Sequence, residues 1–468
     1  MFVHLHCHSH YSFLRGVASP EEIIAAAAEQ KMLAVALTDT NGLYAAVPFY
    51  QAAKKAGIKP IVGVVLDVEW AQDQREIPRL RAPTGSGPSA RNDSFKSMPL
   101  VLLAADMEGY SNLCQLVTLR HLGTTTLTKN VAAGKEDGRP VTLQELAEHS
   151  RGVIALCPLP ARLPDVTSHF SRLKEIFGDR LYIEVRILSP GDRRTLREAE
   201  HLGRELGLPL VATNSVHYLR PEEHLHHRAV NAIRTGGLLT TVMPPEITTG
   251  EAWFKSFAEM QQLFPDHPEL LQATTEIAER CNLQLELGKL IFPEFSVPEG
   301  ESPFSYLWKL SFDGARKCYK PLRPEVLSRL THELEVIEKL HLAPYFLLVW
   351  DIVEEARRRG IPAVARGSAA SSMVTYCLGI SRVCPLRWGL YFERFLNEQR
   401  GDCPDIDIDI CGARRDELLD YVYEHWGAEH VAMIGSFITM HARLGGQFDR
   451  DVLPGGFAGL PAAMGTVL

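Results

Sequence analysis

The chain has 468 residues, which are too many for one ordinary hydrophobic core and predict two or three domains. Hydrophobic residues make up 46% and charged residues 23% of the chain, which excludes collagen-like, coiled-coil and wholly disordered proteins. The 49 Lys and Arg residues against 57 Asp and Glu residues leave a net charge of −8, so contact with nucleic acid would require a local basic patch.

The first residues, MFVHLHCHSHYSFLRG, lack the basic and apolar regions of a signal peptide. No stretch of about 18 apolar residues runs without charge, so we expect a cytoplasmic protein that does not contact a membrane. The nine cysteines include no CxxC pair, which argues against a secreted disulfide framework and against a zinc ribbon.

Short apolar runs alternate with helical patterns from residue 1 to about 220, and repeated β–α units predict a parallel sheet or a β/α barrel. A helix is expected after Ser19, which offers an N-cap and is followed by Pro20 and by Glu22 at the third helical position. Two stretches without periodicity, 71–98 and 129–141, are expected to be loops. Seven strands are predicted, at residues 2–5, 33–38, 61–68, 100–105, 153–157, 181–185 and 210–213.

A second region begins near residue 285, after an extended linker that contains prolines. No helical or strand period is found at 444–468, where we expect an irregular, truncated tail. The predicted domains are therefore 1–280, 281–443 and this tail. The second domain is predicted to contain helices at 302–318, 324–341 and 345–359, a glycine–serine turn at 366–372, a strand at 404–410 and a helix at 413–426.

Histidines occupy alternate positions at the end of the first predicted strand, where an extended chain places their rings on one face. Asp39 and His217 follow two later strands, and the carboxyl ends of the strands of a β/α barrel converge on one edge. The pattern predicts a metal site at this edge, with a polar strand edge as the plainer alternative. The histidines are His4, His6, His8 and His10.

The segments LHCHSHYSFL, ALTDTNGLYAA, IKPIVGVVL and LVATNSVHYL resemble the polymerase-and-histidinol-phosphatase (PHP) domain of bacterial family C DNA polymerases. The resemblance implies an α/β fold with a distorted seven-strand barrel, which in metal-competent relatives binds up to three metal ions and has phosphoesterase or exonuclease activity. By this resemblance, His6, His8 and His217 match expected metal ligands. Other ligand positions of the family are occupied here by Arg15, Thr40, Val65, Pro99 and Ser215.

Carboxylates offset cation charge and bridge neighbouring ions, so their replacement argues against a trinuclear centre. The three remaining histidines can hold one Zn²⁺ or Mn²⁺. We favour a barrel that supports the second domain structurally over an active exonuclease.

The segment PDIDIDI at 404–410 carries three acidic residues at alternate positions. A strand would place Asp405, Asp407 and Asp409 on one face and the isoleucines on the other. Such carboxylates suit two Mg²⁺ ions ~3.5–4 Å apart, whereas a solvated edge strand is the plainer alternative. Upstream, Arg366, Gly367 and Ser368 are predicted at a strand-to-helix turn, where backbone amides can hold phosphate. A serine-rich helix cap is the alternative there.

The order ARGSAASSMVTYCLGIS, PLRWGLYFERFLNEQ, PDIDIDI and RRDELLDYVYEHWG resembles the palm of the same polymerases and is nearer their error-prone branch. The resemblance implies an incomplete, α+β nucleotidyltransferase-like palm in which Asp405 and Asp407 are two of three catalytic, Mg²⁺-binding aspartates. It also implies that Arg366, Gly367, Ser368 and Arg394 contact the triphosphate.

The resemblance further implies a DNA-directed DNA polymerase of replication or error-prone repair, which acts on template–primer DNA and deoxynucleoside triphosphates. A sliding clamp and other replication or repair proteins bind this family through regions beyond the present segment. Because the third aspartate of the family also lies beyond it, we predict that this chain alone is inactive. The alternatives are a metal-dependent phosphoesterase that uses His6, His8, Asp39 and His217, and a non-catalytic scaffold.

Overall fold

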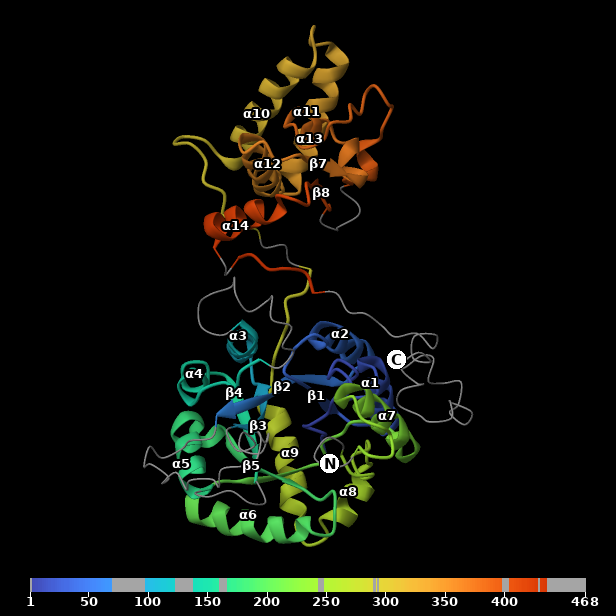
Figure 1. Cartoon of the computed structure of the whole chain (residues 1–468), viewed down its shortest axis with the longest axis vertical. Coiled ribbons are helices and arrows are strands. Elements are labelled where there is room, and N and C mark those ends of the chain that lie inside the picture. Colours follow the sequence, from blue (N-terminus) through green and yellow to red (C-terminus); the bar gives the residue numbers. More distant parts are fainter. Residues whose placement is uncertain are drawn as a thin grey trace, which may run out of the picture. The chain divides into compact units, whose positions relative to one another are not determined.

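The computed structural model describes residues 2–69, 97–122, 138–159, 166–242, 248–288, 292, 294–397, 404–427 and 430–435. The chain divides into two compact units, one that extends to Leu285 and one that begins at Glu286 (Figure 1). The predicted tail at 444–468 and most of the two predicted loops lie outside the described residues. No described helix is long and apolar enough to cross a membrane.

The first unit contains six strands and nine α-helices within its described residues. The strands are β1 (Ala34–Thr40), β2 (Lys59–Glu69), β3 (Ser97–Ala104), β4 (Val153–Pro158), β5 (Leu181–Arg186) and β6 (Leu210–Thr213). The helices are α1 (Pro20–Glu29), α2 (Ala46–Ala56), α3 (Met107–Leu122), α4 (Leu143–Glu148), α5 (Val166–Phe177), α6 (Asp192–Leu206), α7 (His224–Thr235), α8 (Phe257–Leu263) and α9 (Pro268–Arg280). Short 3-10 turns are η2 (Gly178–Arg180) and η3 (Pro221–Glu223).

The six strands form one curled sheet in the order β1 to β6. Neighbouring strands are parallel except that β3 is antiparallel to both β2 and β4. The prediction of parallel strands is therefore wrong for β3. Apolar runs buried on both faces look alike in either direction, so the sequence pattern cannot reveal this reversal.

The first predicted strand is not part of this sheet, but its chain is extended and bonded on both sides. The amides of Ala36 and Thr38 in β1 donate to the carbonyls of His4 and Cys7, each at 2.8 Å. On the other side, Val216 exchanges hydrogen bonds of 2.8 and 2.9 Å with His8 and His6. The histidine segment thus lies between β1 and the chain that follows β6.

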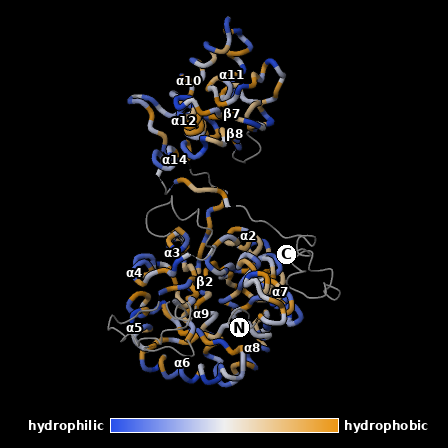
Figure 2. The backbone as a smooth tube through the Cα atoms, in the orientation of Figure 1, coloured by the Kyte–Doolittle hydropathy of each residue, from blue (hydrophilic) through white to orange (hydrophobic). Residues whose placement is uncertain are grey.

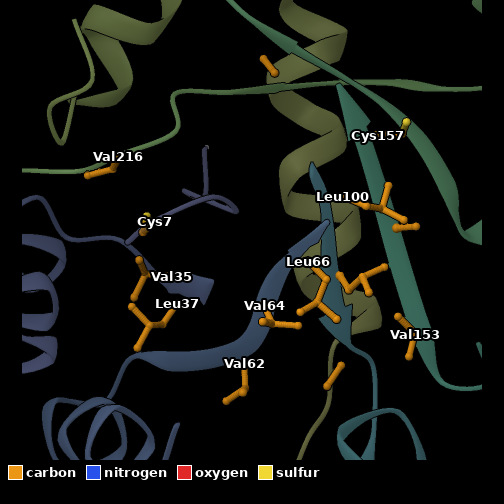
Figure 3. Packing of buried hydrophobic residues seen from close by; sticks show 14 of the residues in the cluster. Cys7, Val35, Leu37, Val62, Val64, Leu66, Leu100, Val153, Cys157 and Val216 are labelled. Atoms are coloured by element: carbon orange, nitrogen blue, oxygen red, sulfur yellow. The ribbon is translucent and has the colours of Figure 1, made fainter. Parts of the chain in front are cut away.

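Successive side chains of a strand point to opposite faces of the sheet, so alternate residues pack into two different hydrophobic cores. Val35 and Leu37 face the outer helices, in the core that Figure 3 shows together with Cys7 and Val216. Ala34 and Ala36 belong instead to the core on the other face, which includes Ile277 of α9. Hydrophilic residues line the solvent side of α6 (Figure 2). The sheet is therefore covered on both faces, and only its edges are open for chemistry.

The predicted start of α1 is confirmed, including its reciprocal cap. Ser19 accepts from the amide of Glu22 at 3.1 Å, and the Glu22 carboxylate accepts from the amide of Ser19 at 2.8 Å.

Four helices of the second unit agree with the predicted ranges within about two residues: α10 (Pro303–Cys318), α11 (Pro324–Lys339), α12 (Ala343–Arg358) and α14 (Arg415–Trp426). The short helix α13 (Met373–Cys377) follows the predicted glycine–serine turn and had no predicted range. The two strands of the unit are β7 (Ala363–Arg366) and β8 (Asp407–Ile410), and its 3-10 turns are η4 (Gly367–Ser371) and η5 (Phe392–Arg394). Phe346, Leu347 and Met373 are among the residues that form the core of this unit.

Candidate nucleotide and metal sites

The acidic segment forms a two-stranded antiparallel ladder with β7. Asp405, Asp407 and Asp409 are exposed, whereas Ile406 and Ile408 pack against the core of the unit. The predicted division into an acidic and an apolar face is therefore present, although β8 itself is limited to Asp407–Ile410.

Arg366 lies opposite Asp407 in the ladder and supplies positive charge to the acidic face. Its Nε is 3.0 Å from Oδ1 of Asp409, and its Nη2 is 3.8 Å from Oδ2 of Asp407. More than half of each of these three side chains is exposed, so each ion pair contributes little stability. The structure thus brings Arg366 to the aspartates, a pairing that sequence reasoning did not predict.

The predicted glycine–serine turn follows β7 as the 3-10 turn η4 and leads into α13. Gly367 has a φ of +68°, in the left-handed region that favours glycine. A Cβ at Gly367 would lie 3.7 Å from Oδ2 of Asp407, so the turn directly adjoins the acidic strand. The first amides of a 3-10 turn have no partner within the turn. Ser368 in this turn is half-buried.

The start of α13, in contrast, is already capped by a residue that sequence reasoning missed. Glu333 of α11 is fully buried and accepts from the amides of Met373 and Val374 at 2.7 and 3.2 Å. It also accepts from the Ser372 hydroxyl at 2.8 Å. Burial raises the pKa of Glu333, while Arg329 and these donors act against that shift. The amides of Met373 and Val374 at the start of α13 are therefore already satisfied within the chain.

Arg394, predicted to contact phosphate, is exposed at the end of η5. A basic run at the end of α12 is paired within the chain: Arg358 and Arg359 lie 2.7 and 2.6 Å from Glu355. Hydrogen bonds from these two arginines lower the pKa of Glu355 to about 2. The charges of Arg358 and Arg359 are therefore balanced in part by a glutamate of the same helix.

The predicted histidine ligands come together at the edge of the first unit's sheet. Nε2 of His6 is 3.0 Å from Nε2 of His8, and the rings of His8 and His217 are 4.3 Å apart. Burial, with smaller contributions from neighbouring cationic groups, lowers the pKa of both His8 and His217. The 3.0 Å between His6 and His8 is a hydrogen-bond distance, and the tautomers of the two rings decide which of the facing nitrogens donates.

Glu184 of β5 orients His6 and is a second residue that sequence reasoning missed. Its Oε1 accepts from Nδ1 of His6 at 2.6 Å and from the Thr213 hydroxyl at 2.5 Å. Although burial alone would raise it, the charges of His6 and Arg186 hold the pKa of Glu184 below its usual range. A carboxylate on Nδ1 of a histidine is the usual outer partner of a metal ligand. The signal in the sequence was a lone acidic residue inside the apolar run LYIEV.

Asp39 and His217, which were also expected at this site, form hydrogen bonds within the chain. Both oxygens of Asp39 accept hydrogen bonds of 2.7 Å from Ser9 and Ser12, and burial raises its pKa. His217 donates from Nδ1 to the carbonyl of Ser215 at 2.7 Å. Within the described parts of the chain, no three His, Cys, Asp or Glu side chains form a ready metal cluster.

A separate cavity of about 740 Å³ lies within the second unit. It contains none of the predicted site residues. Its walls are formed by Glu294, Phe295, Ser296, Tyr306, Trp350, Asp351, His425, Trp426 and His430.

Comparison with known proteins finds two families along the chain. Residues 4–189 match the PHP domain, and residues 305–452 match the bacterial DNA polymerase III alpha NTPase domain. The error-prone DNA polymerase of Symbiobacterium thermophilum is 37% identical over 459 residues, which are 94% of this chain and 40% of that protein. The DNA polymerase III subunit alpha of Bacillus subtilis is 35% identical over 455 residues, 94% of this chain and 38% of that protein.

The chain therefore contains a PHP domain followed by a bacterial DNA polymerase III alpha NTPase domain.

The chain spans about two fifths of the length of these DNA polymerase III alpha relatives. The acidic strand and the η4 turn lie inside the region matched to the NTPase domain of the family, and His6 and His8 lie inside the PHP match. His217 lies beyond that match. Among solved structures, a putative metal-dependent phosphoesterase from Bifidobacterium adolescentis aligns with 46% of this chain and 87% of its own, at 10% identity and a TM-score of 0.32.

Proposed function

We propose that this chain is the PHP and palm portion of a Mg²⁺-dependent, DNA-directed DNA polymerase. Asp405 and Asp407 would hold the metal, and the η4 turn would hold the incoming deoxynucleoside triphosphate. One observation carries the proposal: the β7–β8 ladder brings Gly367 and Asp407 together, so that the turn proposed to bind phosphate adjoins the carboxylates proposed to bind the metal. The names of the relatives support the same reaction, with template–primer DNA as the second substrate.

The proposed chemistry divides between the ion and the chain. Mg²⁺, when bound, neutralises the triphosphate and activates the attacking hydroxyl. Asp407 and Asp405 provide hard oxygen ligands of the kind that Mg²⁺ prefers. Gly367 lacks a side chain that would keep a phosphate from the η4 amides. Arg366 and Arg394 are exposed and can balance phosphate charge.

The finer architecture belongs to the same proposal. The extended segment from His4 to His8 would serve as the seventh strand of a distorted barrel, because it is hydrogen-bonded to β1 and to Val216. The β7–β8 ladder with its helices would be an incomplete nucleotidyltransferase palm.

Binding of a deoxynucleoside triphosphate tests this function. We expect weak, Mg²⁺-dependent binding by the chain in isothermal titration calorimetry. The double variant Ser368→Ala with Asp405→Asn should lose it, whereas Asp416→Asn, an exposed position in α14, should not. Equal binding by the double variant and the parent would contradict the assignment.

A metal site in the first unit is a second candidate, favoured by the contact between Glu184 and His6. We propose that His6, His8 and His217 hold at most one Zn²⁺ or Mn²⁺ per chain. Elemental analysis should find no more than one stoichiometric ion, and His6→Ala should remove it. Two or more ions that are lost together in this variant would contradict the proposal. The phosphoesterase alternative is not favoured, because Asp39 already accepts three hydrogen bonds.

A further inference from the structure

We propose that Glu333 and Arg329 of α11 are positioning residues of the candidate nucleotide site. They would fix η4 against the acidic strand and align it with the segment that carries Arg394. This inference rests on the proposed function and adds two residues that touch neither the aspartates nor the η4 amides.

The Glu333 carboxylate holds the far end of the turn. It accepts the amides of Met373 and Val374 and the Ser372 hydroxyl, and Nε of Arg329 lies 2.6 Å from its Oε1. A buried carboxylate with this many donors is costly to disturb, because each donor would lose its partner. Its side chain thus occupies the place at the start of α13 that an anionic ligand would otherwise take.

The hydrogen bonds continue from α13 back to the turn. The Thr375 hydroxyl donates to the carbonyl of Ala369 at 2.7 Å, and Ala369 is a fully buried residue of η4. The same turn begins at Gly367, beside Asp407. A shift at the start of α13 would therefore be transmitted through Ala369 to the turn that begins beside Asp407.

Arg329 contacts both η4 and the segment that leads into η5. Its Nη2 donates to the carbonyls of Ser371 and Leu390 at 3.3 and 3.1 Å, and its guanidinium lies 5.9 Å from the centre of the Phe392 ring. Only a planar guanidinium can contact Glu333 with one nitrogen and two carbonyls with another. The residue thus joins η4 to the start of η5, which ends at Arg394.

The test compares Glu333→Gln and Arg329→Lys with Glu335→Gln, which changes an exposed position of the same helix. Hydrogen–deuterium exchange would follow the amides of 366–376 and 390–394. Calorimetry would measure the binding of dATP with Mg²⁺. Electron paramagnetic resonance would measure the binding of Mn²⁺ without nucleotide, with every variant made in a His6→Ala background so that the ion proposed for the first unit does not contribute.

We expect faster exchange in η4 and at the start of α13 in Glu333→Gln, and in both segments in Arg329→Lys. dATP binding should weaken by about tenfold in Glu333→Gln and by less in Arg329→Lys, because lysine keeps the charge. Mn²⁺ binding should stay at the parent value, which a general loss of structure would not allow. If Glu333→Gln fails to fold, Arg329→Lys carries the test.

Unchanged exchange in both variants would overturn the inference, as would faster exchange with dATP binding equal to that of the parent. Loss of Mn²⁺ binding together with dATP binding would also overturn it, since the residues would then only stabilise the unit. A parent chain that binds neither Mn²⁺ nor dATP would instead contradict the proposed function itself.

Discussion

Arg366 is the residue whose position in the structure changes the interpretation of the acidic strand most. Three carboxylates on one strand face require a positive partner, and the guanidinium of the opposing strand provides it. The same guanidinium would have to leave Asp407 when a divalent ion binds there. It would then be released to contact phosphate.

Replacement of this guanidinium should separate the two roles. We expect Arg366→Gln to raise the affinity of the nucleotide-free chain for Mn²⁺ by roughly two- to fivefold, which corresponds to the modest energy of an exposed ion pair. Binding of dATP should weaken in the same variant. Arg382→Gln, at another exposed position, is the control. Unchanged Mn²⁺ affinity would show that Arg366 does not compete with the metal.

His169 of α5 gives the first unit a dependence on pH. It is 2% exposed, and its burial, with a smaller contribution from Arg172, lowers its pKa to about 4 from the ordinary value of 6.5. Between these two pH values the unfolded chain binds a proton that the folded chain does not. The free energy of unfolding therefore falls as the pH decreases through this range.

Between pH 7 and pH 4, the free energy of unfolding should decrease less in His169→Gln than in the parent. We expect the difference to be up to about 3 kcal/mol. Urea unfolding of the first unit at a series of pH values would measure it. His201→Gln, whose side chain is 79% exposed in the parent, should leave the pH profile unchanged. Parallel profiles for parent and His169→Gln would contradict the assignment.

The sequence allowed the residues on regular patterns to be predicted, but not their distant partners. The exposed face of Asp405, Asp407 and Asp409 follows from strand periodicity alone. Glu333 lies in an ordinary amphipathic helix, and its importance comes from contacts with residues about 40 positions away. No local pattern records such a contact.

At the scale of elements, α10 and α13 approach too closely for any side chain at their crossing. A Cβ at Gly314 of α10 would lie 1.9 Å from the carbonyl oxygen of Cys377. Since that oxygen belongs to the backbone, the whole helix would have to move. The fit between these helices sets where α13, and with it η4, lies in the second unit.

Gly314→Ala should therefore lower the free energy of unfolding of the second unit by about 1–3 kcal/mol, although alanine favours helices. Chemical denaturation followed by tryptophan fluorescence would measure the change. Gly412→Ala, where an added Cβ meets nothing within 4 Å, serves as the comparison. An increase in stability in Gly314→Ala would refute the close crossing.

Element positions were predicted well and strand directions were not. Four helices of the second unit were predicted within about two residues of their bounds, whereas the reversal of β3 depends on how the chain returns to the sheet. The first predicted strand failed for a related reason. Its hydrogen bonds join it to two segments without the regular ladder that defines a strand.

For the whole molecule, we expect that a polypeptide of these 468 residues does not extend a primer. The resemblance to family C polymerases implies that two-metal transfer would need a third carboxylate from another strand. Within the part of the chain that the structure describes, β8 pairs with β7 alone. Asp409 lies ~6.6–7 Å along the strand from Asp407, too far to serve as that neighbour, and it is paired with Arg366.

Primer extension with the purified chain would check this expectation. Asp405→Ala with Asp407→Ala controls for contaminating polymerases. Extension by the parent but not by the double variant would refute the prediction, and would mean that Asp409 or a residue outside the described ranges completes the site.

The reversal of β3 matters for anyone who wishes to engineer a metal centre with more ligands at the edge of this sheet. Since β3 runs against β2, its amino end, where Pro99 is opposite Asp67, lies at the same edge as the carboxyl ends of the other strands. A new ligand from β3 must therefore be installed at the beginning of the strand, for example as Pro99→His. Ligands from the other strands must be installed at their ends or just beyond, as Ser215→Asp would be. A design rule that uses strand ends throughout would place the β3 ligand on the wrong side of the sheet.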